Sequence, residues 1–264
     1  MRNIAVISLI AVSALSMAVS IPYSTGFETT EVPAWGSPNP ATNVDWNGLN
    51  NWRVSTAQKF AGVQSLQATT NGTTALPSTT IQPTSFLASQ NQGQIQTNVK
   101  LYLDSTSQFG TTSVNNVHGL SSNITWNSGI SSRAIRIGVQ NNGNVVLWTN
   151  STFTYQTIGT ISSFQNQWLD LNLILDTTNQ NVGYNFAILN SSNTQVFAGS
   201  GNILTTPVTD ARIAFTSVVA VANGSGGPMN AFYDNFNISQ AVPEPASMTI
   251  LGLGAAALLR RRKK

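Results

Sequence analysis

Residues 94–103 read QIQTNVKLYL, and this stretch decides the fold class. Every second position, from Ile95 to Leu103, carries an apolar side chain or Thr97, and the positions between them are mostly polar. Side chains of a β-strand point alternately to its two faces, so the pattern predicts a strand with one buried face. Residues 168–175 (WLDLNLIL) repeat it with leucines at alternate positions.

Further strands are expected on both sides of these two. Asn141-Asn142-Gly143 and residues 190–193 read as hairpin turns, because Asn and Gly tolerate positive φ. The expected flanking and closing strands are Ala134–Val139, Asn144–Trp148, Tyr184–Leu189, Gln195–Ala198, Ala211–Val219 and Ala231–Ser239. No helical period occurs in residues 21–240, whereas 30–60 and 105–130 look loop-rich. The sequence therefore predicts an all-β, antiparallel two-sheet sandwich as one domain over residues 21–240.

Composition limits the classes of function. Within residues 21–240 there are six Lys and Arg against eight Asp and Glu, so no basic surface for nucleic acid is expected. The chain has no cysteine, which excludes disulfides, thiol nucleophiles and Cys-ligated metals. Abundant Asn, Ser and Thr would also suit a disordered chain, but 41% hydrophobic content favours a packed core.

The N-terminus has the features of a secretory signal peptide. Arg2 provides a positive start, residues 4–19 are apolar apart from three serines, and small residues allow cleavage after Ser20 or Ala18. Pro22 follows this boundary, which disfavours the alternative of a retained membrane anchor. We therefore expect residues 1–20 to direct export through the Sec pathway.

Residues 242–264 form a second address at the C-terminus. An uncharged stretch, 246–259, follows two prolines and precedes five consecutive cations, 260–264. As a helix the stretch is about 21 Å long, against a bilayer core of about 30 Å. The basic block argues against a helix buried in the domain and favours a short transmembrane helix with cytoplasmic cations, inserted transiently.

These features resemble the PEP-CTERM sorting signal. Pro243, Glu244 and Pro245 match its name-giving element, and Arg260, Arg261 and Arg262 begin its basic end. The resemblance implies an exosortase-type processing enzyme as partner. It also implies a membrane-anchored precursor and a destination at the cell surface or in the matrix of bacteria that make exopolysaccharide.

The order of strand motifs resembles the concanavalin A-like lectin/glucanase jelly roll. The first motif, YSTGFE at residues 23–28, matches in style FYDNFNI at 232–238, near the end of the domain. Jelly-roll glucanases typically carry a Glu-x-Asp-x-x-Glu run on one strand, and this chain has none. Glu28 and Glu31, three apart in a turn, do not replace it, and His118, the one histidine, is expected in a solvent-exposed loop. We expect no enzymatic activity.

The sequence offers oxygen ligands for a structural calcium ion. Extracellular sandwiches often tie the first strand to the last through oxygen ligands, and Glu28, Asp234 and Asn235 suit such a site. The alternative is that Asp234 caps a turn and Glu28 faces solvent.

Glycan binding uses aromatic rings and amides. Asp45, Trp46, Asn47 and Trp126 lie in loop-like surroundings and form the candidate set, whereas Trp52, Trp148 and Trp168 lie in strand patterns and are expected in the core or on a sheet face. The leading expectation is an exported, non-enzymatic protein with a structural or interaction role in the exopolysaccharide layer. A specific carbohydrate-binding module is the alternative.

Overall fold

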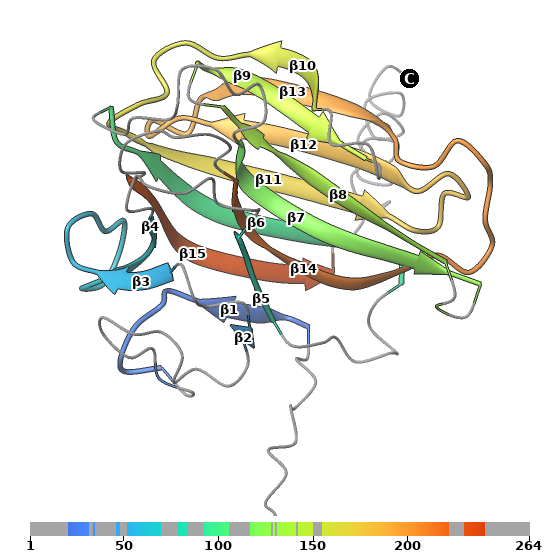
Figure 1. Cartoon of the computed structure of the whole chain (residues 1–264), viewed down its shortest axis with the longest axis horizontal. Coiled ribbons are helices and arrows are strands. Elements are labelled where there is room, and N and C mark those ends of the chain that lie inside the picture. The colour runs from blue at the N-terminus through green and yellow to red at the C-terminus, as the bar shows by residue number, and fades with distance from the viewer. Residues whose placement is uncertain are drawn as a thin grey trace, which may run out of the picture.

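The computed structural model describes residues 21–31, 34, 46–47, 52–69, 79–83, 92–105, 117–127, 129, 131–140, 142–149, 155–221 and 230–240. These segments form two antiparallel β-sheets (Figure 1), which confirms the all-β prediction. In this part of the chain no helix is long and apolar enough to cross a bilayer. The expected signal peptide, C-terminal helix and basic tail lie outside the described residues.

The first sheet has eight strands in the order β13-β12-β11-β6-β15-β4-β3, and β1 also pairs with β15. Its strands are β1 (Tyr23–Thr25), β3 (Trp52–Ser55), β4 (Ser65–Thr69), β6 (Gln94–Leu103), β11 (Trp168–Asp176), β12 (Gly183–Leu189), β13 (Gln195–Asn202) and β15 (Asn230–Gln240). β1 aligns Tyr23 with Ile238 and Thr25 with Phe236, so the first described strand is tied to the last.

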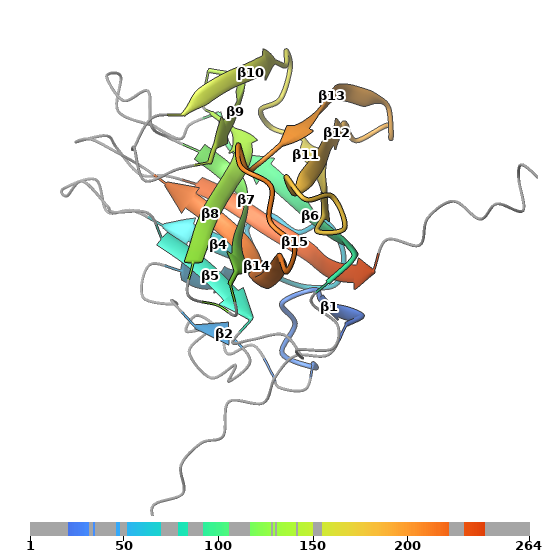
Figure 2. The ribbon, with the colours of Figure 1, turned by 90° about the vertical axis from the view of Figure 1, so that its right-hand side faces the viewer.

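The second sheet has seven strands in the order β10-β9-β8-β7-β14-β5-β2. Its strands are β2 (Trp46–Asn47), β5 (Thr79–Pro83), β7 (Val117–Trp126), β8 (Ser131–Val139), β9 (Asn144–Trp148), β10 (Gln156–Thr160) and β14 (Arg212–Val221). Figure 2 shows this sheet, with β7 and β8, beside the sheet that contains β6, β11 and β15. Gly143, at φ 85°, turns the chain between β8 and β9, which confirms the predicted hairpin.

The core lies between the sheets. Along β6 and β11 buried and partly exposed residues alternate without interruption, as the sequence predicts. Leu101 and Leu169 are paired and buried, and each such leucine contributes roughly 1.5–3 kcal/mol by leaving water. The opposite side chains of the same strands therefore face away from the core.

Hydrogen bonds also join the two sheets. The Tyr233 hydroxyl of β15 donates to the Val219 carbonyl of β14 at 2.7 Å. Thr97 of β6 donates to the hydroxyl of Thr216 of β14 at 3.2 Å. Within the second sheet, Ser122 of β7 donates to the same oxygen at 2.8 Å. These bonds satisfy buried polar groups that would otherwise be costly.

β7 corrects the prediction of loops at 105–130. It is a ten-residue strand in the interior of its sheet, paired with β8 and β14. Its first six residues are all buried, so no alternation with exposed positions marks it. Gly119 and Gly138 face each other so closely that a Cβ on Gly119 would lie 2.3 Å from the Ile137 carbonyl oxygen.

Candidate functional site

The outward side chains of β6, β11 and β12 form a polar face on the eight-stranded sheet. The register aligns them in rows across the strands, with Asn98 beside Asn172 and Gln96 beside Ile174. We call this surface the polar face; its members are Gln94, Gln96, Asn98, Lys100, Tyr102, Trp168, Asp170, Asn172, Ile174, Asp176, Asn185 and Ala187. They project here because the core takes the alternate positions of the same strands.

Aromatic rings close one end of the polar face. Trp168 lies 5.5 Å from Tyr102 and 5.9 Å from Phe60, measured between ring centroids. Phe60 comes from the β3–β4 connection and is 46% exposed. Edge and tilted contacts of this kind are favourable for aromatic pairs. They place a partly exposed ring cluster at the end of the amide rows.

Lys100 and Asp170 form an ion pair on the polar face, in the row next to the aromatic end. The Lys100 Nζ lies 2.7 Å from Asp170 Oδ2, and the two side chains are 18% and 25% exposed. The same ammonium lies 4.6 Å from the centroid of the Phe60 ring. The lysine charge is therefore neutralised by a carboxylate and covered by an aromatic face.

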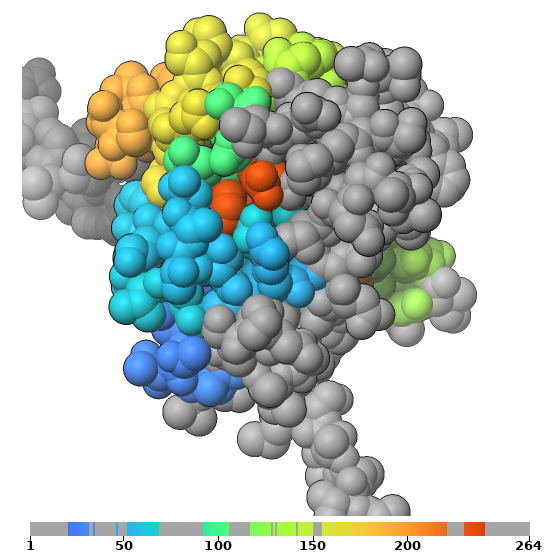
Figure 3. All heavy atoms as spheres, turned by 60° about the vertical axis from the view of Figure 1, so that its left-hand side comes forward, coloured from blue at the N-terminus to red at the C-terminus, as the bar shows by residue number. Residues whose placement is uncertain are grey.

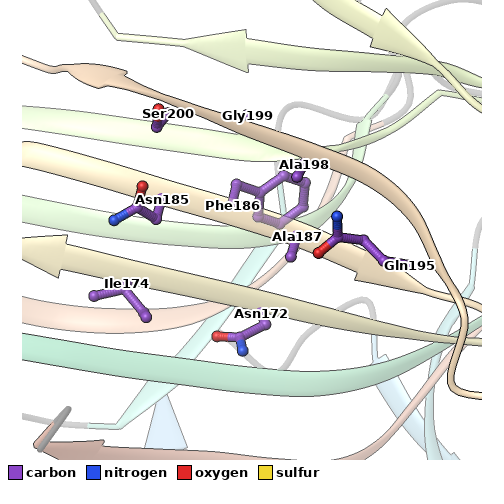
Figure 4. A pocket seen from close by; sticks show the side chains of 9 residues that line it. All are labelled: Asn172, Ile174, Asn185, Phe186, Ala187, Gln195, Ala198, Gly199 and Ser200. Carbon is purple, nitrogen blue, oxygen red and sulfur yellow. The ribbon is translucent and has the colours of Figure 1, made fainter. Parts of the chain in front are cut away.

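Beyond the ion pair the polar face opens into a pocket of about 340 Å³ over β11, β12 and β13. Figure 4 shows the amide side chains of Asn172, Asn185 and Gln195 lining it, one from each strand. The Asn172 Oδ1 is buried and has no hydrogen-bond partner among the described residues. A buried acceptor of this kind carries a cost until a donor reaches it.

The β3–β4 connection, residues 56–64, folds against the aromatic end and is held by two carboxylates. Asp234 Oδ2 accepts hydrogen bonds from Phe60 N at 2.8 Å and Ala61 N at 3.1 Å. Glu28 Oε1 accepts from Val63 N at 2.9 Å and Gln64 N at 3.3 Å. Figure 3 shows residues 52–69 (cyan) at the surface beside β15 (orange-red).

These contacts bear on the predicted calcium site. Burial raises the pKa of Asp234, the nearby Glu28 carboxylate adds to the effect, and the backbone N–H donors oppose it. Asp234 Oδ1 also accepts from Asn235 N at 2.7 Å. Within the described residues no three acidic, His or Cys side chains gather as metal ligands. The oxygens of Asp234 are engaged by N–H donors, an arrangement that does not fit an ion cage. Calcium stays a prediction, which the effect of EDTA on the melting temperature tests.

Trp46 requires a correction. It was expected to offer its ring to a sugar from a loop, but it is 3% exposed and packs against Phe27 and Phe236 at centroid distances of 5.9 and 5.0 Å. Its Nε1 donates to the Tyr23 hydroxyl at 2.6 Å. Trp46 is therefore a core residue. Asp45 lies outside the described residues, and Asn47 belongs to β2.

Trp126 lies at one end of the sandwich, beside a second pocket. This pocket of about 390 Å³ is also lined by Asn127, Arg133 and the segment 204–209. Asn127 N donates to Asp210 Oδ1 at 2.9 Å, which connects the β7–β8 turn to that segment. The structure thus gives Trp126 a partly exposed setting with polar neighbours, separate from the polar face.

His118 is also placed differently from the prediction. It lies in β7 with 0% exposure, not in a solvent-exposed loop, and burial lowers the pKa of its imidazole to about 3. The expected sheet or core positions of Trp52, Trp148 and Trp168 are confirmed, because each lies in a strand and Trp52 is buried. The polar face itself was missed as a site, although the alternation in 94–103 and 168–175 already separated its members from the core.

The polar face contains no histidine. The C-terminal end of the chain is identified by a sequence comparison. A family model described as the PEP-CTERM protein-sorting motif matches residues 241–263. The chain carries a PEP-CTERM sorting motif. This confirms the resemblance to the PEP-CTERM sorting signal, and it implies export with a membrane-anchored precursor.

Solved structures resemble the body of this chain in fold. A PL-14 alginate lyase from Aplysia kurodai has a TM-score of 0.56 and 12% identity, covering 74% of this chain and 89% of the lyase. The cellulose-induced protein Cip1 has a TM-score of 0.51 and 12% identity, covering 83% and 97%. Peanut lectin has a TM-score of 0.46 and 9% identity, covering 84% and 99%. The two antiparallel sheets and the likeness to the lyase and to Cip1 bear out the predicted jelly-roll-like fold. No curated protein matches the sequence.

Proposed function

We propose that this chain is an exported, non-enzymatic protein of the cell surface or extracellular matrix that acts structurally in the exopolysaccharide layer. It holds that layer by binding glycan along the polar face. The observation that carries the proposal is the juxtaposition of a ring cluster, Phe60, Trp168 and Tyr102, with rows of amides on the same sheet.

The chemistry of the polar face suits sugars. The C–H face of a pyranose packs on an aromatic ring, and its hydroxyls exchange hydrogen bonds with amides and carboxylates. The amides of Asn172, Asn185 and Gln195 line a pocket of about 340 Å³, which gives room for such contacts. The rows extend across several strands, which favours a polymer over a single sugar unit.

The same residues support binding without turnover. Proton abstraction or glycosidic cleavage needs a general base or a carboxylate pair poised for it. On the polar face Asp170 is held by Lys100 at 2.7 Å, and the sole histidine of the sequence lies buried in the other sheet. Measured depolymerisation of alginate would instead establish that the chain is an enzyme of the lyase type.

Sorting completes the proposal. Residues 1–20 direct export through the Sec pathway, and the segment 246–259 holds the precursor in the membrane. An exosortase-type enzyme acts at Pro243-Glu244-Pro245. The match of the sorting motif to residues 241–263 supports this part.

The experiment is retention of the purified full-length chain in affinity gels that contain plant or bacterial polysaccharides. Trp168→Ala should weaken binding by about 5- to 20-fold, the loss expected for one stacking ring. Trp148→Ala is the matched control, because Trp148 lies on the seven-stranded sheet beneath Arg136, at 4.9 Å. An equal loss of retention in both variants would contradict the proposal. So would a wild type and a control that no polymer retains.

A second candidate is a specific lectin-like site at Trp126. The pocket of about 390 Å³ with Arg133 and threonine hydroxyls favours it. In the same gels, loss of retention in Trp126→Ala with retention kept in Trp168→Ala would move the binding site from the polar face to this pocket.

A further inference from the structure

We infer that the polar face selects uncharged polysaccharides and rejects polyuronates. The inference rests on the proposed function and adds the chemical class of the ligand. It follows from where the charges of the domain lie.

Positive charge is nearly absent from the polar face. All six cations of residues 21–240 belong to described residues, so the remaining loops of the domain can add none. Arg133 and Arg136 belong to β8 and Arg212 to β14, all in the seven-stranded sheet. Arg53 of β3 donates from Nε to Gln67 Oε1 at 2.9 Å. Lys100 is the one cation in the rows, and Lys59 is an exposed cation in the neighbouring connection.

Lys100 is not available to a carboxylated sugar. Its Nζ is bonded to Asp170 at 2.7 Å and lies 4.6 Å from the Phe60 ring centroid. A uronate would have to displace Asp170, which is already held at charge-assisted hydrogen-bond distance. The gain from the new pair would be offset by the loss of the existing one.

The charge that remains on the polar face beside this ion pair is negative. Asp176 stands at the far end of β6 and β11; burial alone would raise its pKa, but hydrogen bonds from Thr178 and Gln94 leave the pKa lowered. Its carboxylate is therefore ionised at neutral pH. Asp170 lies beside Lys100 in the neighbouring strand, whereas Asp234 is fully buried beneath the β3–β4 connection. Two carboxylates, Asp170 and Asp176, accompany one neutralised lysine on the polar face, so a chain of uronates meets net negative charge, whereas hydroxyls find acceptors.

Affinity electrophoresis of the full-length chain tests this with two neutral polymers, hydroxyethyl cellulose and galactomannan, and two polyuronates, alginate and polygalacturonate. The wild type should be retarded by at least one neutral polymer and by neither polyuronate. Asp170→Asn is nearly isosteric and frees Lys100, so its affinity for alginate should rise about 10-fold, as for one new charge-assisted contact. That gain should fall as salt is raised.

Two controls define the cause. Adding Lys100→Met to Asp170→Asn should abolish the gain, and Lys59→Gln should leave the preference of the wild type unchanged. A melting curve of each variant shows that the domain is folded. Wild-type binding to alginate equal to that of the neutral polymers would overturn the inference and leave glycan binding intact. Binding to none of the four polymers would overturn the proposed function as well.

Discussion

His118 shows how strongly a single residue can couple this domain to pH. Its imidazole lies in β7 with 0% exposure, and burial lowers its pKa to about 3. The same group in an unfolded chain titrates near 6.5. Between these values the unfolded chain binds a proton that the folded chain does not. The contribution of His118 to the free energy of unfolding is therefore complete above about pH 6.5, and it declines as the pH falls toward 3.

The free energy of unfolding should fall by up to about 1.4 kcal/mol per pH unit in this window from His118 alone. Denaturant unfolding at several pH values measures it. The side chain of His118→Leu cannot titrate. The free energy of unfolding of the wild type minus that of the variant should therefore fall as the pH is lowered. Asp234, whose pKa is raised, acts in the opposite sense, since its contribution is lost as the pH rises. It is common to both proteins. A pH-independent difference would contradict the assignment.

The tryptophans show how far the position of a single residue can be predicted from the sequence. Trp52, Trp148 and Trp168 were assigned to strands from alternation, and that was correct. Trp46 was assigned to a binding loop from its polar neighbours, but it lies in a two-residue strand and is buried by Tyr23, Phe27 and Phe236. Those partners are distant in the sequence, so local composition could not reveal the burial.

At the scale of the element, alternation is informative only where one face of a strand meets solvent. β6 and β11 have one such face, and the predicted bounds 94–103 coincide with β6. β7 has none over its first six residues, and it carries serines and a histidine inside the protein. Ser122 is satisfied by Thr216 from the neighbouring strand, a contact that the sequence does not announce.

The contact between β15 and β14 gives a prediction at this scale. Tyr233→Phe removes the hydroxyl that reaches the Val219 carbonyl across the core. The free energy of unfolding should fall by about 1–3 kcal/mol, because a buried acceptor loses its donor. Denaturant melts measure the loss. Tyr102→Phe, on the polar face, is the control and should change stability by less than about 0.5 kcal/mol. Similar losses in both would argue against the role of the intersheet bond.

At the scale of the whole molecule, the body and its address are independent. The two sheets lie within residues 21–240, whereas the sorting motif covers 241–263. The fold class, the hairpins and the address could be predicted, because periodicity, turn residues and an ordered motif are local signals. The polar face could not, because it exists only when β6, β11 and β12 are brought into register.

Changing the address should therefore alter location and leave folding unchanged. In the producing cell, Glu244→Gln should leave most of the chain in the membrane fraction at its uncleaved mass, since the Pro-Glu-Pro element is altered. Cell fractionation with mass spectrometry measures this. Asp104→Asn, which removes a carboxylate from the body, is the control and should be distributed as the wild type. Normal processing of Glu244→Gln would show that this glutamate is dispensable.

β15 is the last described strand in the chain and an interior strand of its sheet, between β6 and β4. An exported chain that emerges N-terminus first delivers this strand last. Until then β3 and β4 have no connection to β6, and β1 has no partner in the sheet. The domain can thus remain incomplete, and thread freely, for almost the whole of translocation. The sheet can close only after β15 has emerged, and the sorting motif begins at the next residue.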